Sequence, residues 1–214
     1  MSLADLQALT SFAVRVRLRR DETTLDAVLP GRSEPVARVH KPAAYSSRQP
    51  YQMFVGAGLA EPVGFIAGFT LFGPDRAQLG KIGDVSGRRG RPRWEVERPG
   101  LPTMVSRPVG ASASQYRFPF TLPAAILGGL LPFRFSFEPS GPSEHSGPFE
   151  PRQAGVGGFV ITRRGGIRSR FEVTVDDPLL DRRVVLAAVT TVNQFGSEDL
   201  RKDLVDGATN PFRR

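Results

Sequence analysis

Residues 177–192 read DPLLDRRVVLAAVTTV, and this stretch decides the fold. From Val184 to Val192 nearly every side chain is apolar, which leaves no polar face if the segment is a helix. A helix that is hydrophobic all round must be buried all round or lie in lipid. The apolar part is well short of the ~20 residues that span a bilayer, so we expect a buried core helix.

The two ends of this stretch favour a helix over a strand. Asp177 can cap free backbone N–H groups, and Pro178 suits the first helical position because it has no N–H to satisfy. Gly196 follows Phe195 and suits a left-handed residue after the last turn. The valines favour a strand by propensity. Length and caps outweigh that propensity, and they predict a helix from about Asp177 to Phe195.

Strand-like segments dominate the rest of the chain. Phe12, Val14, Val16 and Leu18 alternate with small or charged residues, which is typical of a half-buried antiparallel strand. Similar segments recur at short intervals: residues 35–40, 51–55, 62–72, 78–83, 93–97, 115–120, 133–138, 158–162 and 170–175.

Turn residues separate these segments. Gly73-Pro74-Asp75-Arg76 and Gly165-Gly166 predict hairpin turns. Ser2 and Asp5 have the spacing of a capping box for a short helix over residues 2–9. The other connections are predicted as irregular stretches (99–114 and 139–157), a buried turn or short helix (123–132), and a polar tail (197–214) with a short helix at 197–205.

The order of elements, many strands before one wholly apolar helix, indicates a sheet that closes around that helix. A large barrel must be filled by something. A helix of about four turns is ~22 Å long, close to the height of a barrel of six-residue strands. We therefore predict a single domain, residues 1–214, of the mainly β class: a closed antiparallel β-barrel that encloses a hydrophobic C-terminal helix.

Composition narrows the function classes only a little. The chain has 214 residues, a formal charge of +8 and a pI near 10.9, which suit an anionic partner. All but three of its 29 basic residues are arginine, a skew that codon bias in a GC-rich bacterium also produces. Cysteine is absent, which excludes disulfides and thiolate metal sites. The N-terminus has no signal-peptide pattern, so we expect a cytoplasmic protein.

The strand, acidic turn and helix at the end of the chain resemble the tubby C-terminal-like superfamily, nearest to its phospholipid scramblase and LURP-one-related branches. The likeness is carried by Phe171–Val175, Asp177-Pro178 and Leu180–Val189, with weaker support from Phe69–Ile82 and Trp94-Glu95-Val96. The resemblance implies a closed antiparallel barrel around a central helix. Tubby-like members bind phosphoinositides through basic residues, and scramblases are associated with lipid movement and calcium.

The chain also departs from that family. It has no cysteine for palmitoylation and no Pro-rich N-terminal arm. No acidic loop after the helix resembles a calcium site, because Arg201 and Lys202 lie between Asp199 and Asp203. The resemblance therefore implies a fold, and we do not extend it to lipid transport or calcium binding.

Two groups of arginines are the candidate binding residues. Arg88, Arg89, Arg91 and Arg93 surround an Arg89-Gly90-Arg91-Pro92 string that matches the core of an AT-hook, which lies in the narrow A·T minor groove. A solvated basic loop is the competing interpretation. The second group flanks a Gly-Gly turn and consists of Arg163, Arg164, Arg168 and Arg170. If the barrel brings both groups to one rim, they form a site for lipid headgroups or phosphates; ordinary charged hairpin tips are the alternative.

Enzyme signals are weak. His40 and His145 are the only histidines, and no Gly-x-Ser-x-Gly elbow accompanies them. Gly73 to Lys81 fails the spacing of a phosphate loop, with Ile82 where a Ser or Thr would hold magnesium. We predict no catalytic residues, no metal and no cofactor.

The sequence thus predicts a non-enzymatic binding or scaffold protein. Its expected partner is an anionic phospholipid surface, which it would touch through an arginine-rich rim as a peripheral protein of the inner membrane face, without a transmembrane span. The alternatives are nucleic-acid binding through the Arg-Gly-Arg-Pro loop, and a protein-partner module that has no charge-based ligand.

Overall fold

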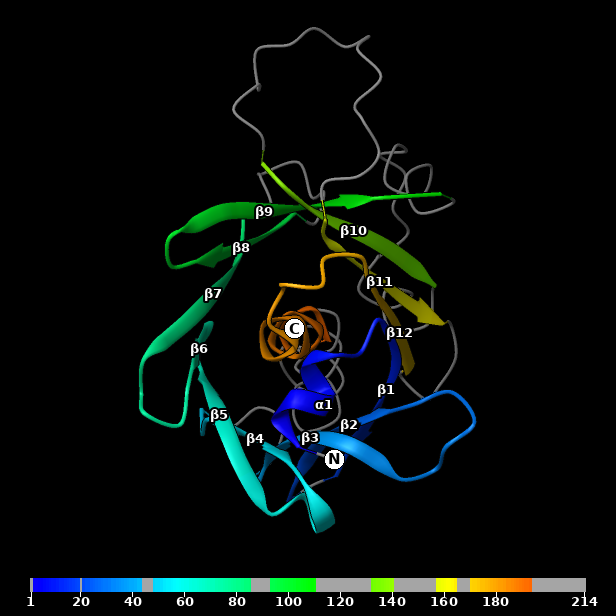
Figure 1. Ribbon diagram of the computed structural model, residues 1–214, viewed down its shortest axis with the longest axis vertical. Helices are drawn as coiled ribbons and strands as arrows, with labels where there is room; N and C mark the ends of the chain where they lie inside the picture. The colour runs from blue at the N-terminus through cyan, green and yellow to red at the C-terminus, as the bar shows by residue number, and fades with distance from the viewer. Residues whose placement is uncertain are drawn as a thin grey trace, which may run out of the picture.

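Twelve antiparallel strands close into a barrel in the described part of the chain (Figure 1). The computed structural model describes residues 2–19, 21–43, 48–85, 93–110, 132–140, 157–164 and 170–193. The strands are β1 (Ser11–Leu18), β2 (Thr23–Val28), β3 (Pro35–Lys41), β4 (Tyr51–Val55), β5 (Glu61–Ala67), β6 (Thr70–Phe72), β7 (Gln78–Asp84), β8 (Trp94–Arg98), β9 (Leu101–Pro108), β10 (Phe133–Pro139), β11 (Phe159–Arg164) and β12 (Arg170–Val175).

The barrel has the simplest possible topology. Every strand pairs with its neighbours in sequence, and β1 pairs with β12 to close the ring. At this closure Phe12 lies opposite Val173 and Val14 opposite Phe171, so both partners point apolar side chains inward. A closed sheet leaves no unpaired edge, which removes the usual route to edge-to-edge aggregation. The predicted fold class is confirmed.

The C-terminal helix, residues 182–193, lies inside the ring of strands, and Figure 1 looks along its axis. Every residue from Val184 to Asn193 is buried, as its all-round apolar character requires. Two threonines fit into this apolar setting because their hydroxyls donate to backbone carbonyls four residues earlier, Thr190 to Leu186 at 2.8 Å and Thr191 to Ala187 at 2.9 Å.

The helix begins later than the sequence indicates, so the prediction that Asp177 and Pro178 start it is wrong. Asp177 instead caps a separate turn, in which the Leu179 N–H donates to Asp177 Oδ1 at 2.8 Å. The helix is capped by Asp181, whose Oδ1 accepts from the backbone N–H of Arg183 at 2.9 Å. Two acidic residues with similar capping chemistry therefore lie four positions apart. Asp177 caps the turn at residues 177–180, which we call the approach turn, and Asp181 caps the helix.

Helix α1 (Leu3–Gln7) closes one mouth of the barrel and fixes the start of the central helix. It has the predicted capping box between Ser2 and Asp5, and its Leu6 is buried. Gln7 accepts from the backbone N–H of Arg182 at 2.9 Å and donates to the carboxylate of Asp181 at 2.7 Å. One side chain therefore satisfies two groups at the helix start and links the two ends of the chain.

Arg182, a long charged side chain that is only 1% exposed, completes this junction. Its guanidinium donates to the carbonyls of Leu9, at 2.7 Å, and of Asp177, at 2.9 Å, and it also bonds to the Leu180 carbonyl. Burial lowers the pKa of Arg182, while Asp177 and Asp181 act to raise it. The cation gathers carbonyls that the approach turn would otherwise leave unpaired.

Three strand predictions need correction. The segment 62–72 is not one strand, because the chain reverses at Gly68 and forms β5 and β6. Residues 101–108, predicted to be irregular, form β9. The sequence does not predict strand β2, because both faces of this strand are buried and its residues do not alternate between apolar and polar. The hairpin turn at Gly73–Arg76 is confirmed by the hydrogen bond from the Gly73 N–H to the Ala77 carbonyl at 2.8 Å.

Several predicted features lie outside the described residues. They are the strand at 115–120, most of the 123–132 and 139–157 segments, the Gly165-Gly166 turn, the helix end at Phe195 with its Gly196 cap, and the tail 197–214. Within the described ranges, no helix combines the length and apolarity that a bilayer crossing requires.

The buried helix makes a direct prediction. Val189 is completely buried, so Val189→Asp would place an unpaired charge in the core at a cost of several kcal/mol, comparable with the whole stability of a domain. We expect loss of cooperative thermal unfolding, measured by circular dichroism, whereas Val189→Ala should cost about 2 kcal/mol and stay folded. A soluble, cooperatively folded aspartate variant would contradict the enclosed helix.

The Asp181 junction predicts a pH dependence. Burial acts to raise the pKa of Asp181, but hydrogen bonds from Arg183 and Gln7 hold it below its ordinary value. A carboxyl whose pKa falls on folding stabilises the protein above its unfolded-state pKa, near 4, and this contribution is lost as the pH drops through the lower folded value. The free energy of unfolding should therefore fall more steeply below about pH 4 in the wild type than in Asp181→Asn. Parallel curves would contradict this role.

Candidate functional site

The strand order decides which connections share an end of the barrel. Because consecutive strands alternate in direction, the connections β1–β2, β3–β4, β5–β6, β7–β8, β9–β10 and β11–β12 all lie at one end. The two connections that carry the predicted arginine groups, β7–β8 and β11–β12, are among them. Helix α1 and the start of the central helix lie at the opposite end.

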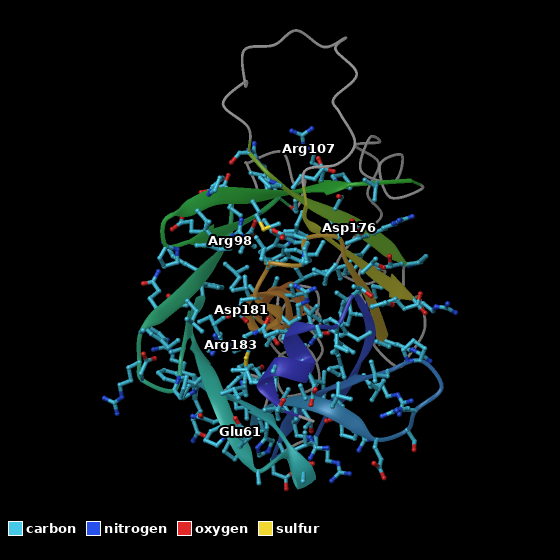
Figure 2. The ribbon with its side chains drawn as sticks, viewed as in Figure 1. Glu61, Arg98, Arg107, Asp176, Asp181 and Arg183 are labelled. Carbon is cyan, nitrogen blue, oxygen red and sulfur yellow. The ribbon has the colours of Figure 1, made fainter. Side chains whose placement is uncertain are left out.

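Among the described residues, eight exposed arginines lie at the first end, near the termini of strands or just outside them. We call this set the arginine rim: Arg17, Arg19, Arg48, Arg93, Arg107, Arg134, Arg164 and Arg170. Figure 2 shows Arg107 on the outer side of the sheet. The described acidic residues at this end are Asp21, Glu22, Asp84 and Glu95. This end of the barrel, the basic end, is therefore strongly positive.

The opposite end has the opposite charge. Its described acidic residues are Asp5, Glu34, Glu61, Asp75, Glu97, Glu138, Asp176, Asp177 and Asp181. They outnumber the described basic residues there, Arg32, Arg76, Arg98, Arg182 and Arg183. Figure 2 shows Glu61, Asp176 and Asp181 around this mouth. The charges of the molecule are thus separated along the barrel axis, and we call this end the acidic end.

Ion pairs neutralise only part of the rim. Arg19 pairs with Glu22 at 3.0 Å, Arg164 with Glu172 at 2.8 Å, and Arg93 with Glu95 at 3.6 Å. The side chains of three further members, Arg48, Arg107 and Arg170, make no hydrogen bond or ion pair within the described ranges. These three guanidinium groups keep their full capacity to bind an anion.

Three arginines lie in direct register across the barrel closure. Arg15 on β1 pairs with Arg170 on β12, and Arg170 pairs with Arg164 on β11. Like charges directly opposite one another destabilise a sheet. Arg164 is compensated by Glu172, and the guanidinium of Arg15 donates to the carbonyls of Arg32 and Ser33, both at 3.4 Å. Of these three arginines, only Arg170 has no side-chain partner in the described ranges.

The same cross-strand row continues into a neutralised segment. Asp26 on β2, opposite Arg15, is buried and accepts from Arg38 at 2.6 and 3.2 Å, with Arg17 at 3.8 Å. Asp26 holds Arg38 against the sheet, so Arg38 is a structural arginine. The two halves of the row therefore differ: one is internally paired, and the other is left positive.

The predicted residues divide into three groups. Arg93, Arg164 and Arg170 lie on the rim, while Arg88, Arg89, Arg91 and Arg168 lie outside the described residues. Arg163 points into the barrel, is buried, and lies 5.9 Å from the Phe133 ring and 6.0 Å from the Phe171 ring. Aromatic faces stabilise such a cation, so Arg163 belongs to the barrel interior.

A second cation is buried inside the same end. Lys41 is almost fully buried, and its ammonium lies 4.6 Å from the centre of the Tyr51 ring. The central helix runs toward this end, so its carbonyl termini are directed at the side that holds Lys41 and Arg163. Cations near the C-terminal side of a helix complement its dipole. The interior of the basic end therefore has the same sign of charge as its rim.

Sequence reasoning missed Arg17, Arg19, Arg48, Arg107 and Arg134 as members of the rim. They are scattered along the chain and share one end of the barrel only because every second strand connection lies there. The sequence does not predict β2 and β9, so the number of strands that separates two arginines cannot be counted from it. The described residues contain no group of three or more His, Cys, Asp and Glu side chains that could hold a metal ion.

Comparison with protein-family models, curated proteins and solved structures finds no match for this chain.

The Asp26 pair yields a test that separates structural from rim arginines. Asp26→Asn removes a buried charge that holds Arg38, and we expect a loss of about 1–3 kcal/mol in the free energy of unfolding. The matched variant Arg17→Gln breaks only the longer contact of an exposed side chain and should cost less than about 1 kcal/mol. Urea denaturation measures both. Equal effects of the two substitutions would show that Asp26 does not clamp Arg38.

Proposed function

We propose that this protein is a non-enzymatic binding or scaffold module whose basic end docks on anionic phospholipid headgroups at the inner face of a membrane. The separation of charge along the barrel axis is the observation that carries the proposal. A uniformly basic surface would follow from composition alone, whereas here acidic residues are concentrated at one end and exposed arginines at the other.

Electrostatics gives such an arrangement a preferred orientation. Each Lys or Arg near an anionic leaflet contributes about 1 kcal/mol of attraction, and the effect fades within a Debye length. Arginines of the rim approach the surface together, while the acidic end is turned away because an anionic leaflet repels it. Since guanidinium binds phosphate oxygens in a forked geometry, headgroup phosphates are the natural contacts.

The fold lends weaker support. A closed twelve-strand antiparallel barrel with a C-terminal helix is consistent with the tubby-like architecture that the terminal residues resemble. Kinship with that superfamily, and with its scramblase and LURP-one-related branches, is part of this proposal. A rigid barrel that displays ligand contacts at one end also agrees with the general observation that binding residues gather on connections held by a scaffold.

Vesicle flotation tests the proposed function. The wild type should float with phosphatidylcholine vesicles that contain phosphatidylserine, should not float with phosphatidylcholine alone, and should dissociate as salt is raised. The double variant Arg107→Glu/Arg170→Glu should bind at least roughly tenfold more weakly. The double variant Arg32→Glu/Arg76→Glu makes the same charge change at the acidic end, and binding should be unaffected.

Two outcomes would count against the proposal. Equal recovery with neutral and anionic vesicles at low salt would remove headgroup recognition. Tight binding to an A·T-rich duplex in preference to a G·C-rich one, lost in Arg91→Ala, would favour nucleic-acid recognition through the Arg89-Gly90-Arg91-Pro92 string.

A further inference from the structure

Four large apolar side chains are well exposed in the described part of the chain, and they are divided evenly between the two ends. Phe69 (44% exposed) and Val85 (41%) lie at the basic end, on the β5–β6 turn and just after β7. Leu101 (54%) and Leu179 (91%) lie at the acidic end. Scattered exposed apolar residues need no explanation. Phe69 and Val85 differ from the two leucines because they lie at the same end as the arginine rim.

The turn that carries Phe69 is short and well defined. Ala67 pairs with Thr70, and Gly68 between them has a φ of +60°, a conformation that glycine adopts at no steric cost. The chain therefore reverses within two residues and leaves Phe69 at the apex. The Phe69 carbonyl accepts from the Ile82 N–H of β7 at 2.8 Å, which ties the apex to the neighbouring strand. Phe69 is thus presented on a firmly held tip.

Val85 directly follows that same neighbouring strand, three residues beyond Ile82. Its N–H donates to the Arg93 carbonyl at 2.8 Å, so the β7–β8 pairing continues past the last residue of β7. The exposed Lys81 is paired with Thr70. Each apolar tip therefore has a cation close by along the backbone: Lys81 beside the Phe69 turn, and Arg93 across from Val85.

We propose that Phe69 and Val85 insert into the headgroup–acyl boundary when the basic end meets an anionic membrane, so that this end is an electrostatic and apolar anchor in one. The inference rests on the proposed function and specifies how the same site holds the bilayer. Interfacial binding strength grows with buried apolar area in addition to attraction for anionic lipid. Segments that bind at this boundary combine Trp, Phe or Leu toward the lipid with Lys and Arg on the polar side.

The two exposed leucines supply a matched control within the same molecule. Phe69→Ser and Val85→Ser remove apolar surface at the basic end, and Leu179→Ser removes it at the acidic end, without any change of charge. We expect Phe69→Ser to bind phosphatidylserine-containing vesicles about tenfold more weakly and Val85→Ser several-fold more weakly. Leu179→Ser should bind as the wild type does. Phe69→Trp should retain binding, which guards against a purely structural effect, and thermal unfolding would verify that each variant is folded.

Depth of insertion can be measured directly. Trp94 is the only tryptophan and is buried, so the wild type supplies the background for an added probe. Fluorescence of Phe69→Trp should shift to the blue and be quenched by bromine-labelled acyl chains on vesicle binding, while that of Leu179→Trp should not change.

Each result separates this inference from the function on which it rests. Suppose that the Arg107→Glu/Arg170→Glu variant loses binding, while Phe69→Ser binds as the wild type does and the fluorescence of Phe69→Trp does not shift. Insertion is then wrong, and headgroup docking stands. If Phe69→Ser and Leu179→Ser weaken binding equally, the basic end is not the anchor. If the wild type binds neither vesicle, both proposals are wrong.

Discussion

The enclosure of one wholly apolar helix is the constraint on which the rest of the structure depends. Residues 184–193 have no face that water could solvate favourably, and burial of the whole circumference requires a wall on every side. A two-layer packing covers only one side of a helix, whereas a closed sheet covers all of them. Closure also satisfies every strand edge, so a single arrangement meets the hydrogen-bonding demand of the sheet and the hydrophobic demand of the helix.

The junction at the acidic end shows how this enclosure is locked. A helix that enters a barrel must leave its first N–H groups and the carbonyls of the approach turn satisfied at the mouth. Asp181 and Gln7 serve the N–H groups, and the buried guanidinium of Arg182 gathers the carbonyls. Residues far apart in the sequence meet here, and for that reason the N-terminal helix is held over this mouth of the barrel.

The sequence predicts the principle of this fold better than its details. Apolar residues around the whole helix predict burial, and alternation predicts most strands, because both patterns are local. The sequence does not locate the helix start, because Asp177 and Asp181 have equal capping chemistry and the contacts that favour Asp181 come from Gln7, far away in sequence. Strand β2 was missed because Asp26 is buried by Arg38 from the next strand, a contact that no alternation reveals. The arginine rim is not predicted for a related reason: its members share an end only because twelve strands alternate in direction.

Charge along the barrel axis connects the fold to what the protein can do. The interior cations Lys41 and Arg163 lie at the end toward which the helix carbonyls point, and the helix start has Asp181 as its cap, so the internal charges follow the helix dipole. The helix dipole does not account for the exposed arginines, because its effect is confined to the last turn of the helix and solvent screens it at the surface. Exposed ion pairs contribute little to stability, so the fold does not depend on the rim arginines. Because neither the helix dipole nor the sheet requires the exposed arginines, they are the part of the structure on which the proposed docking to an anionic surface rests.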